Sequence, residues 1–245
     1  MIILRYFWFG ANVLIWTVII ASTGIIGSSF EWRGKFMAWI AKTWSKLLLF
    51  IGGIDYEVFG LDNLDPNRSY LFAANHESAL DIPLVFAVLP YHIVAVAKIE
   101  LKRIPIFGWS MMAGGHFFVD RKNSKRALKS LEHAKTSMLN NPRSIIIYPE
   151  GSRSNDGYIK PFKKGGIVLA IDMNLPVVPV ALCGTRECLG DKKFTLKNNT
   201  IEMRIGKPME TNALEYEDRN KFVENVRNEV VRLKSKWDYQ PAEFN

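Results

Sequence analysis

Two apolar stretches begin the chain, and they differ in charge. Phe7 to Ile26 gives twenty mostly apolar residues without a charged one, about the length that a helix needs to cross a bilayer. Phe36 to Ile54 carries Lys42 and Lys46 near its middle, and two central lysines cost roughly 5 to 7 kcal/mol on an insertion scale. We therefore expect the first stretch to be a retained membrane anchor rather than a cleaved signal peptide, and the second to be an amphipathic helix.

The second stretch has the pattern of a helix that lies in the membrane interface. A helix would place Lys35, Lys42 and Lys46 on one narrow face, and Trp39 adds an indole ring, which favours the headgroup region. A helix packed on the protein core is the alternative. Basic residues follow the first stretch, so the positive-inside rule predicts attachment to the inner (cytoplasmic) membrane, with the rest of the chain facing the cytoplasm. We expect residues 1–54 to form a membrane-associated two-helix segment.

Residues 55–245 show a different pattern, in which short β-rich runs alternate with helical stretches near 124–139 and 218–237. This alternation predicts a single α/β domain with a central sheet flanked by helices. The predicted strands are YLFAA (70–74), IVAVA (93–97), HFFV (116–119), SIIIY (144–148), VVPVAL (177–182) and TIEMRI (200–205).

Polar residues follow four of these runs at the point where each ends. The first run leads into His76, the second into Lys98, the third into Arg121 and the fourth into residues 149–153. In α/β sheets, ligands tend to bind beyond the carboxyl ends of the strands. The pattern therefore indicates one site that collects these side chains.

His76 and Asp81 are candidates for acid–base chemistry. Within one helix they would lie roughly 140° apart and could not touch, so His76 must precede the helix. Asp81 in the first turn could then accept a hydrogen bond from one imidazole nitrogen and leave the other as a general base. Ser78 and Asp81 also have capping-box spacing, so a helix that starts at Ser78 is a simpler account of Asp81 alone. The sequence contains no G-x-S-x-G elbow, which favours a substrate hydroxyl as the nucleophile.

Candidate phosphate ligands come from the other strand ends. Arg121 and Arg153 supply two guanidinium forks suited to a phosphate monoester, although an ordinary surface salt bridge would explain either one alone. Gly151 would allow close approach of the backbone, and Glu150 could orient an arginine or accept from a substrate hydroxyl. Lys98 adds positive charge to the same region. We expect the remaining histidines to be structural or at the surface: His92, His116 and His133.

Charge and cysteine content limit the kinds of partner and of bound group that the chain is expected to have. The chain has 32 Lys and Arg against 24 Asp and Glu, a net charge of +8, which favours an anionic partner such as a nucleic acid, an acidic membrane or a phosphorylated substrate. The sequence contains no nucleic-acid motif, so we expect no such partner. Cys183 and Cys188 are the only cysteines, which indicates neither a disulfide scaffold nor a thiolate metal site. Flavin and nicotinamide fingerprints are absent too, and we expect no cofactor and no metal.

Four ordered blocks carry a resemblance to a known family. "NHESALD" resembles the NHxxxxD motif of the membrane-bound glycerolipid acyltransferases, and "KIELKRIPIFGWSMMAGGHFFVDR" resembles their second block. "YPEGSRS" and "LPVVPVA" resemble the third and fourth, with Ser152 where the family more often has Thr. The resemblance covers about residues 60 to 185. Four blocks in order are far more specific than one, and within the family the chain most resembles the enzymes that acylate 1-acyl-sn-glycerol-3-phosphate.

The resemblance implies an acyltransferase and assigns roles to the site. It makes His76 the general base and Asp81 the partner that orients it. The acyl group would pass from acyl-CoA or acyl carrier protein to the free sn-2 hydroxyl of lysophosphatidic acid, giving phosphatidic acid without an acyl-enzyme. The implied acceptor-phosphate site consists of Arg121, Glu150, Gly151, Ser152 and Arg153.

Two alternatives stay open at this point. The His–Asp machinery does not encode the acceptor, so another lysolipid or glycerol-3-phosphate would serve it equally well. A non-catalytic basic membrane adaptor would need the positive charge but neither His76 nor Asp81. Salt-sensitive binding without turnover would distinguish the adaptor.

Overall fold

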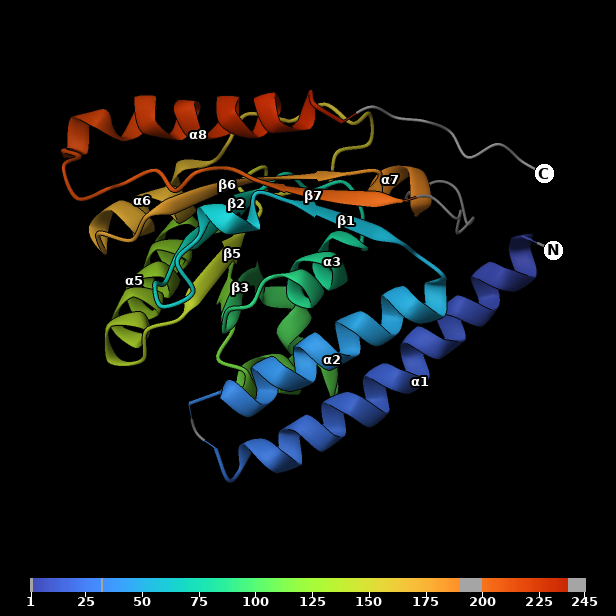
Figure 1. Cartoon of the computed structure of the whole chain (residues 1–245). Coiled ribbons are helices and arrows are strands. Elements are labelled where there is room, and N and C mark those ends of the chain that lie inside the picture. The colour runs from blue at the N-terminus through green and yellow to red at the C-terminus, as the bar shows by residue number, and fades with distance from the viewer. Residues whose placement is uncertain (1, 32, 190–199, 238–245) are drawn as a thin grey trace.

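The computed structural model describes residues 2–31, 33–189 and 200–237, and these form the predicted α/β fold (Figure 1). A seven-stranded sheet runs through the described part in the order β1-β7-β6-β2-β5-β3-β4. Neighbouring strands are parallel except β6 and β7. The strands are β1 (Tyr56–Phe59), β2 (Leu71–Ala74), β3 (Ile93–Lys98), β4 (Phe117–Val119), β5 (Ser144–Ile147), β6 (Val177–Cys183) and β7 (Ile201–Ile205).

The six predicted strands are confirmed, and β1 was missed. β2, β5 and β6 are buried at every position, as expected for parallel strands covered on both faces, whose sequences read as continuous apolar runs. β1 lies at the sheet edge, and three of its four residues are exposed. Its short, exposed sequence therefore lacks the apolar pattern by which the other strands were found.

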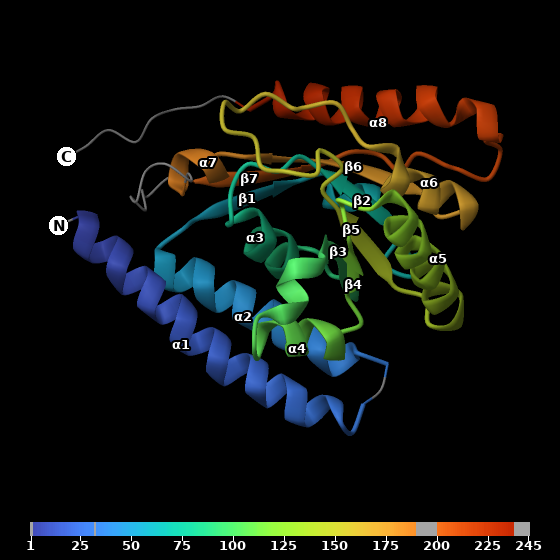
Figure 2. The same cartoon turned by 180° about the vertical axis from the view of Figure 1, so that it is seen from behind.

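Helices cover both faces of the sheet (Figures 1 and 2). The α5, α6 and α8 side chains share one core with the sheet, while α2 and α3 contribute to the core on the opposite face. In α8, Phe222, Val226, Val230 and Leu233 are buried, which confirms its predicted apolar face. The helices of this part are α3 (Asp81–Val88), α4 (Phe107–Ala113), α5 (Ser124–Asn140), α6 (Lys164–Asp172), α7 (Thr185–Cys188) and α8 (Arg219–Lys234), with short 3₁₀ helices η1 (Leu61–Asn63), η2 (Ile99–Arg103) and η3 (Tyr216–Asp218).

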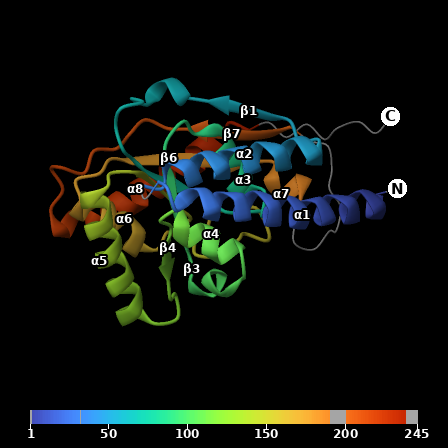
Figure 3. The ribbon, with the colours of Figure 1, turned by 90° about the horizontal axis from the view of Figure 1, so that it is seen from below.

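The two N-terminal helices, α1 (Ile2–Ser28) and α2 (Lys35–Gly52), run side by side, and α1 also packs against α4 (Figure 3). Phe9 of α1 and Leu49 of α2 belong to the same buried cluster as Phe72 of β2. The Lys42 ammonium donates to the Leu89 carbonyl at 3.3 Å. One face of α2 therefore packs on the protein core, and the predicted boundary at residue 54 separates segments whose buried side chains share one core.

The outer face of the helix pair is apolar. Phe7 is 74% exposed and Phe50 is 82% exposed. From Phe7 to Ser28, α1 is long and apolar enough to cross a membrane, by length and composition. Exposed apolar residues recur along α1 at the spacing of one helical face: Leu4, Phe7, Leu14, Ile15, Val18, Ile19 and Ile26.

The strand order explains why the polar strand ends meet. β2, β5, β3 and β4 are consecutive and parallel, so their carboxyl ends lie along one edge of the sheet. β6 is parallel to β2 on its other side and ends at the same edge. The segments that follow these strands supply the candidate site.

Candidate active site

His76 lies in the turn between β2 and α3, and its Nδ1 is 2.6 Å from Asp81 Oδ2. Asp81 begins α3 and is fully buried, whereas the His76 side chain is 18% exposed. A carboxylate can only accept here, so Nδ1 carries the proton, and Nε2 keeps the lone pair of a base. The predicted hydrogen bond between these two residues is thus present.

The Asp81 carboxylate receives four hydrogen bonds. Besides the imidazole, Oδ2 accepts from the backbone N–H of Glu77 at 2.7 Å and of Ser78 at 2.9 Å. Oδ1 accepts from the Thr185 hydroxyl at 2.5 Å. These donors stabilise the ionised carboxylate in a buried place and fix its orientation toward His76.

The prediction that the helix starts at Ser78 is wrong. α3 begins at Asp81, with Leu80 as its N-cap residue. The Ser78 hydroxyl instead donates to the Leu189 carbonyl and accepts from the Leu80 N–H. Asp81 combines two roles, because it binds backbone N–H groups at the start of α3 as well as the imidazole.

Glu150 and Tyr148 hold the His76 residue in place. The Glu150 carboxylate accepts from the His76 N–H at 2.8 Å and from the Lys160 N–H at 2.9 Å. Burial raises the pKa of Glu150, while these two backbone bonds act in the opposite direction. The ring of Tyr148 stacks on the imidazole with centroids 4.3 Å apart. Glu150 thus positions the turn that carries His76, and its contact with substrate stays a prediction.

A second buried network lies behind the turn. The Asn75 side chain donates to the Leu182 carbonyl and accepts from the Leu182 N–H, which joins the end of β2 to β6. Asn75 also donates to Glu77, whose carboxylate forms an ion pair with Lys234 of α8. Burial raises the pKa of Glu77, and the nearby ammonium lowers it. Glu77, for which the sequence suggested no role, therefore connects α8 to the turn that carries His76.

Thr185 and Lys234 are the site residues that the sequence reasoning missed. Thr185 follows β6, so the rule that polar residues gather at strand ends would have found it if applied to that strand too. No local pattern points to Lys234. Its partner is 157 positions away in the chain, and only the fold brings them together.

The predicted cationic residues are placed differently from one another. Lys98 and Arg121 line the same cavity as His76, and the Arg121 guanidinium donates to the Gly151 carbonyl at 2.6 Å. Gly151 has a φ of 78°, which favours glycine. Ser152 and Arg153 are exposed and do not belong to the cavity lining. The geometry therefore brings Lys98, Arg121 and Gly151 to the site, while Ser152 and Arg153 lie outside the cavity.

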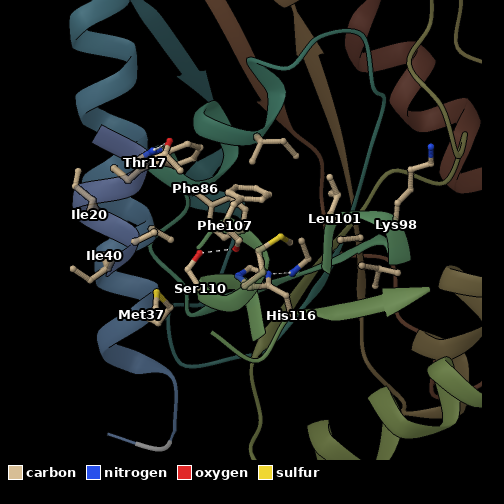
Figure 4. Close-up of a pocket in the computed structure, with 18 of the residues that line it drawn as sticks. Thr17, Ile20, Met37, Ile40, Phe86, Lys98, Leu101, Phe107, Ser110 and His116 are labelled. Atoms are coloured by element: carbon tan, nitrogen blue, oxygen red, sulfur yellow. Dashed lines mark hydrogen bonds between the residues drawn. The ribbon is translucent and has the colours of Figure 1, made fainter. Parts of the chain in front are cut away.

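A cavity of about 230 Å³ is lined by His76 and borders the N-terminal helices, which contribute Thr17, Ile20, Met37 and Ile40 to its wall (Figure 4). Its wall is mostly apolar and comes from α1, α2, α3, β3, η2 and α4. Ile20, Ile40, Phe86 and Leu101 are representative lining residues. Such a space fits a hydrocarbon chain with its reactive end at the imidazole.

The other histidines differ in environment. His133 is exposed on α5, and His116 lines the cavity. Burial, together with the charge of Arg143, lowers the pKa of His92 to about 4. Among the residues that the structure describes, no group of His, Cys, Asp and Glu is arranged to hold a metal ion.

Comparisons with known proteins agree with this geometry. Residues 55–183 match the family model described as "Acyltransferase". The chain is 32% identical over 207 residues to 1-acyl-sn-glycerol-3-phosphate acyltransferase of Saccharomyces cerevisiae, covering 83% of this chain and 68% of that protein. It is 28% identical over 186 residues to the alpha enzyme of that name from Ovis aries, covering 75% of this chain and 64% of the relative.

A solved structure extends the similarity to nearly the whole chain. The crystal structure of the 1-acyl-sn-glycerophosphate (LPA) acyltransferase PlsC from Thermotoga maritima superposes with a TM-score of 0.80 at 26% identity, covering 96% of this chain and 97% of that one. The family match covers more than half of the chain and contains His76, Asp81, Arg121 and Glu150. The chain therefore belongs to the acyltransferase family.

Proposed function

We propose that this acyltransferase transfers a fatty acyl group from an acyl thioester to the free sn-2 hydroxyl of 1-acyl-sn-glycerol-3-phosphate, giving phosphatidic acid. The observation that carries the proposal is the His76 imidazole, which is bound to Asp81 through Nδ1 at 2.6 Å and lines a mostly apolar cavity. The relatives named above, which carry this activity in their names, support the choice of acceptor.

The residues support direct transfer without an acyl-enzyme. His76 Nε2 takes the proton of the acceptor hydroxyl as its oxygen attacks the thioester carbonyl carbon. The imidazolium so formed is stabilised by the Asp81 carboxylate. When the carbon–sulfur bond breaks, the proton passes from Nε2 to the leaving thiolate, and His76 returns to its neutral form. Cys183 and Cys188 are buried, which agrees with a protein that uses no thiol nucleophile.

Positive charge on the cavity lining supports a phosphorylated acceptor. Arg121 and Lys98 line the same cavity as His76, and an arginine fork and an ammonium can bind a phosphate monoester. Burial lowers the pKa of Arg121, yet its ordinary value is so high that the guanidinium stays charged. Arg153 would complete the phosphate site only if the acceptor extends beyond the cavity.

The apolar surface supports work at a membrane. We propose attachment to the cytoplasmic face of the inner membrane through the exposed apolar face of α1, with the catalytic domain in the cytoplasm. The opposite face of α1 packs on α2 and α4. The helix would therefore contact the domain on one face and the membrane on the other. The lysolipid would then arrive from the bilayer and the acyl-CoA or acyl carrier protein from the cytoplasm.

A turnover assay tests the proposal. The full chain in phospholipid vesicles should convert lysophosphatidic acid with palmitoyl-CoA or palmitoyl-acyl carrier protein to phosphatidic acid, measured by mass spectrometry. His76→Ala should lower the rate about 10²- to 10⁴-fold, the range that a general base supplies. His133→Ala is the matched control, because His133 is exposed on α5, and it should keep the wild-type rate.

The same assay tests the acceptor. With palmitoyl-acyl carrier protein as donor, Arg121→Gln should raise KM for lysophosphatidic acid more than it changes KM for the donor. The acceptor carries a phosphate monoester, whereas the phosphopantetheine arm of this donor carries only a phosphodiester. Turnover of His76→Ala at the wild-type rate would contradict the mechanism. A preference for glycerol-3-phosphate or an uncharged lysolipid in an acceptor panel would contradict the proposed substrate.

A further inference from the structure

His116 is a polar group in the wall of the apolar cavity that the mechanism does not use. It precedes β4 and lines the cavity between α2 and α4, near Met37 and Ser110 (Figure 4). Its ring packs at a tilt against Phe86, with centroids 5.8 Å apart. Away from the catalytic end, most of its neighbours on this wall are apolar, so an imidazole here needs an explanation.

A backbone hydrogen bond fixes the tautomer of His116. The Ala95 N–H donates to His116 Nδ1 at 2.8 Å, which requires a lone pair on Nδ1. Neutral His116 must therefore carry its proton on Nε2. Burial, together with His92 and Arg143, lowers the pKa of His116 to about 4, so the ring is neutral at physiological pH.

The Nε2–H group is a donor directed away from the strand. In the described part of the chain, the bond from Ala95 is the one hydrogen bond of the His116 side chain. A methyl group on Gly114 would lie 3.1 Å from Nε2 and 3.0 Å from Met37 Cγ, which places Nε2 beside the cavity-lining Met37. A bare alkyl chain in this space would displace water from Nε2–H without replacing its hydrogen bond.

Ser110 offers the complementary function on the same wall. Its hydroxyl donates to the Phe107 carbonyl at 2.8 Å, so its oxygen keeps lone pairs that can accept. Thr17, farther along the cavity, already accepts from the Trp44 indole N–H and donates to Val13. His116 as donor and Ser110 as acceptor together match a hydroxyl group, which both accepts and donates.

We infer that His116, with Ser110, forms a hydroxyl-recognition subsite in the acyl cavity, so that the enzyme selects a hydroxylated acyl chain over an unsubstituted chain of equal length. The inference rests on the proposed function, since it assigns the cavity to the acyl donor. One net hydrogen bond between neutral groups corresponds to about a 3- to 10-fold preference. A keto group, which only accepts, should gain less than a hydroxyl.

The experiment compares donors that differ in one oxygen atom. Wild-type protein in vesicles is given lysophosphatidic acid with palmitoyl-CoA, each positional hydroxypalmitoyl-CoA and the corresponding ketone. We expect one positional isomer to exceed palmitoyl-CoA in kcat/KM by about 3- to 10-fold. Affinities of the same thioesters without acceptor, measured by isothermal titration, should show the same order.

Two variants of His116 separate the role of its Nε2–H donor from the role of its hydrogen bond with the Ala95 N–H. His116→Asn can keep an acceptor for the Ala95 N–H but loses the donor at Nε2, so the preference should disappear. His116→Gln can keep a donor near the Nε2 position but loses the Nδ1 acceptor, so a folded variant should retain the preference. His92→Asn is the matched control, because His92 is not part of the cavity lining, and it should not change the ratio.

Three outcomes have distinct meanings. A wild-type enzyme that treats every isomer like palmitoyl-CoA, in turnover and in titration, overturns the subsite. An unchanged preference in His116→Asn overturns the role of His116. Absence of turnover with any donor would contradict the proposed function instead, and the titrations would still decide the subsite.

Discussion

Two imidazoles line the apolar cavity, those of His76 and His116, and their hydrogen-bond partners give them opposite properties. His76 Nδ1 meets the Asp81 carboxylate, which only accepts, so Nε2 is left as a base. His116 Nδ1 meets the Ala95 N–H, which only donates, so Nε2 carries the proton. The same residue type therefore presents a proton acceptor at one position in the cavity wall and a hydrogen-bond donor at the other.

The hydrogen-bond partner of Nδ1 thus decides what each histidine can do. The partner of His76 is a buried carboxylate with three further donors, which can stabilise an imidazolium. The partner of His116 is a backbone amide, and its pKa is lowered by burial and by the neighbouring His92 and Arg143. Three sets of variants and one change of pH test this contrast between the two residues.

Of these changes, removing the negative charge of Asp81 should lower activity most. In Asp81→Asn, the N–H groups of Glu77 and Ser78 point at the Oδ2 position and should hold the amide oxygen there. The tautomer of His76 is then kept, but the imidazolium loses its counter-charge. We expect kcat to fall about 10²- to 10³-fold, with the melting temperature as the control for folding; a loss below threefold would contradict the role of Asp81.

The stability of the fold at acidic pH should show whether His116 is held neutral. Its pKa is 6.5 when unperturbed and about 4 in the folded protein, so the unfolded chain binds this proton more tightly. Its contribution to stability is complete above pH 6.5 and is lost as the pH falls toward 4, by about 3 kcal/mol at most.

Urea unfolding between pH 7 and 4 measures this loss. His116→Asn should show a weaker pH dependence than wild type, although His92 titrates in the same window. His133→Asn, on an exposed histidine, should follow the wild type. Identical curves for wild type and His116→Asn would mean that His116 is not held neutral.

Substitution of Thr185 should reduce activity less than substitution of Asp81. Thr185→Val removes one of the four hydrogen bonds to Asp81 and leaves Oδ1 buried without a partner. We expect kcat/KM to fall about tenfold, since a hydrogen bond to a charged group contributes about 1.5 kcal/mol or more. Thr185→Ser keeps the hydroxyl and should retain most of the activity; equal losses in both variants would indicate a packing role.

Tyr148 should show the smallest effect. Its hydroxyl is buried and, within the described residues, has no hydrogen-bond partner, and burial raises its pKa well above the ordinary value. Tyr148→Phe keeps the ring that stacks on His76, so kcat should stay within about twofold of wild type, because no hydrogen bond is lost. A larger loss would show that the hydroxyl contacts the substrate, whereas Tyr148→Leu removes the stacking and should cost more.

Much of this architecture could be predicted from the sequence. Apolar runs predicted β2, β5 and β6, because buried parallel strands are apolar at every position. The geometry of the strand-to-helix turn predicted that His76 could reach Asp81. The cavity lining, with His116 as its polar group, could not be predicted. The helices α1, α2 and α4 form the cavity wall through tertiary packing, which no local pattern encodes. The sequence also assigned His116 to a structural or surface role, since its partner is a backbone N–H of Ala95, which any residue but proline offers.

The opposite tautomers can be observed directly in a long-range ¹H–¹⁵N spectrum of the protein labelled with ¹⁵N-histidine. The spectrum is recorded at a pH at which both rings are neutral, and the signals are assigned with His76→Ala and His116→Asn. The structure predicts the proton of His76 on Nδ1 and that of His116 on Nε2. Finding the proton on the same nitrogen in both rings would contradict the account of one base and one donor in the wall of the cavity.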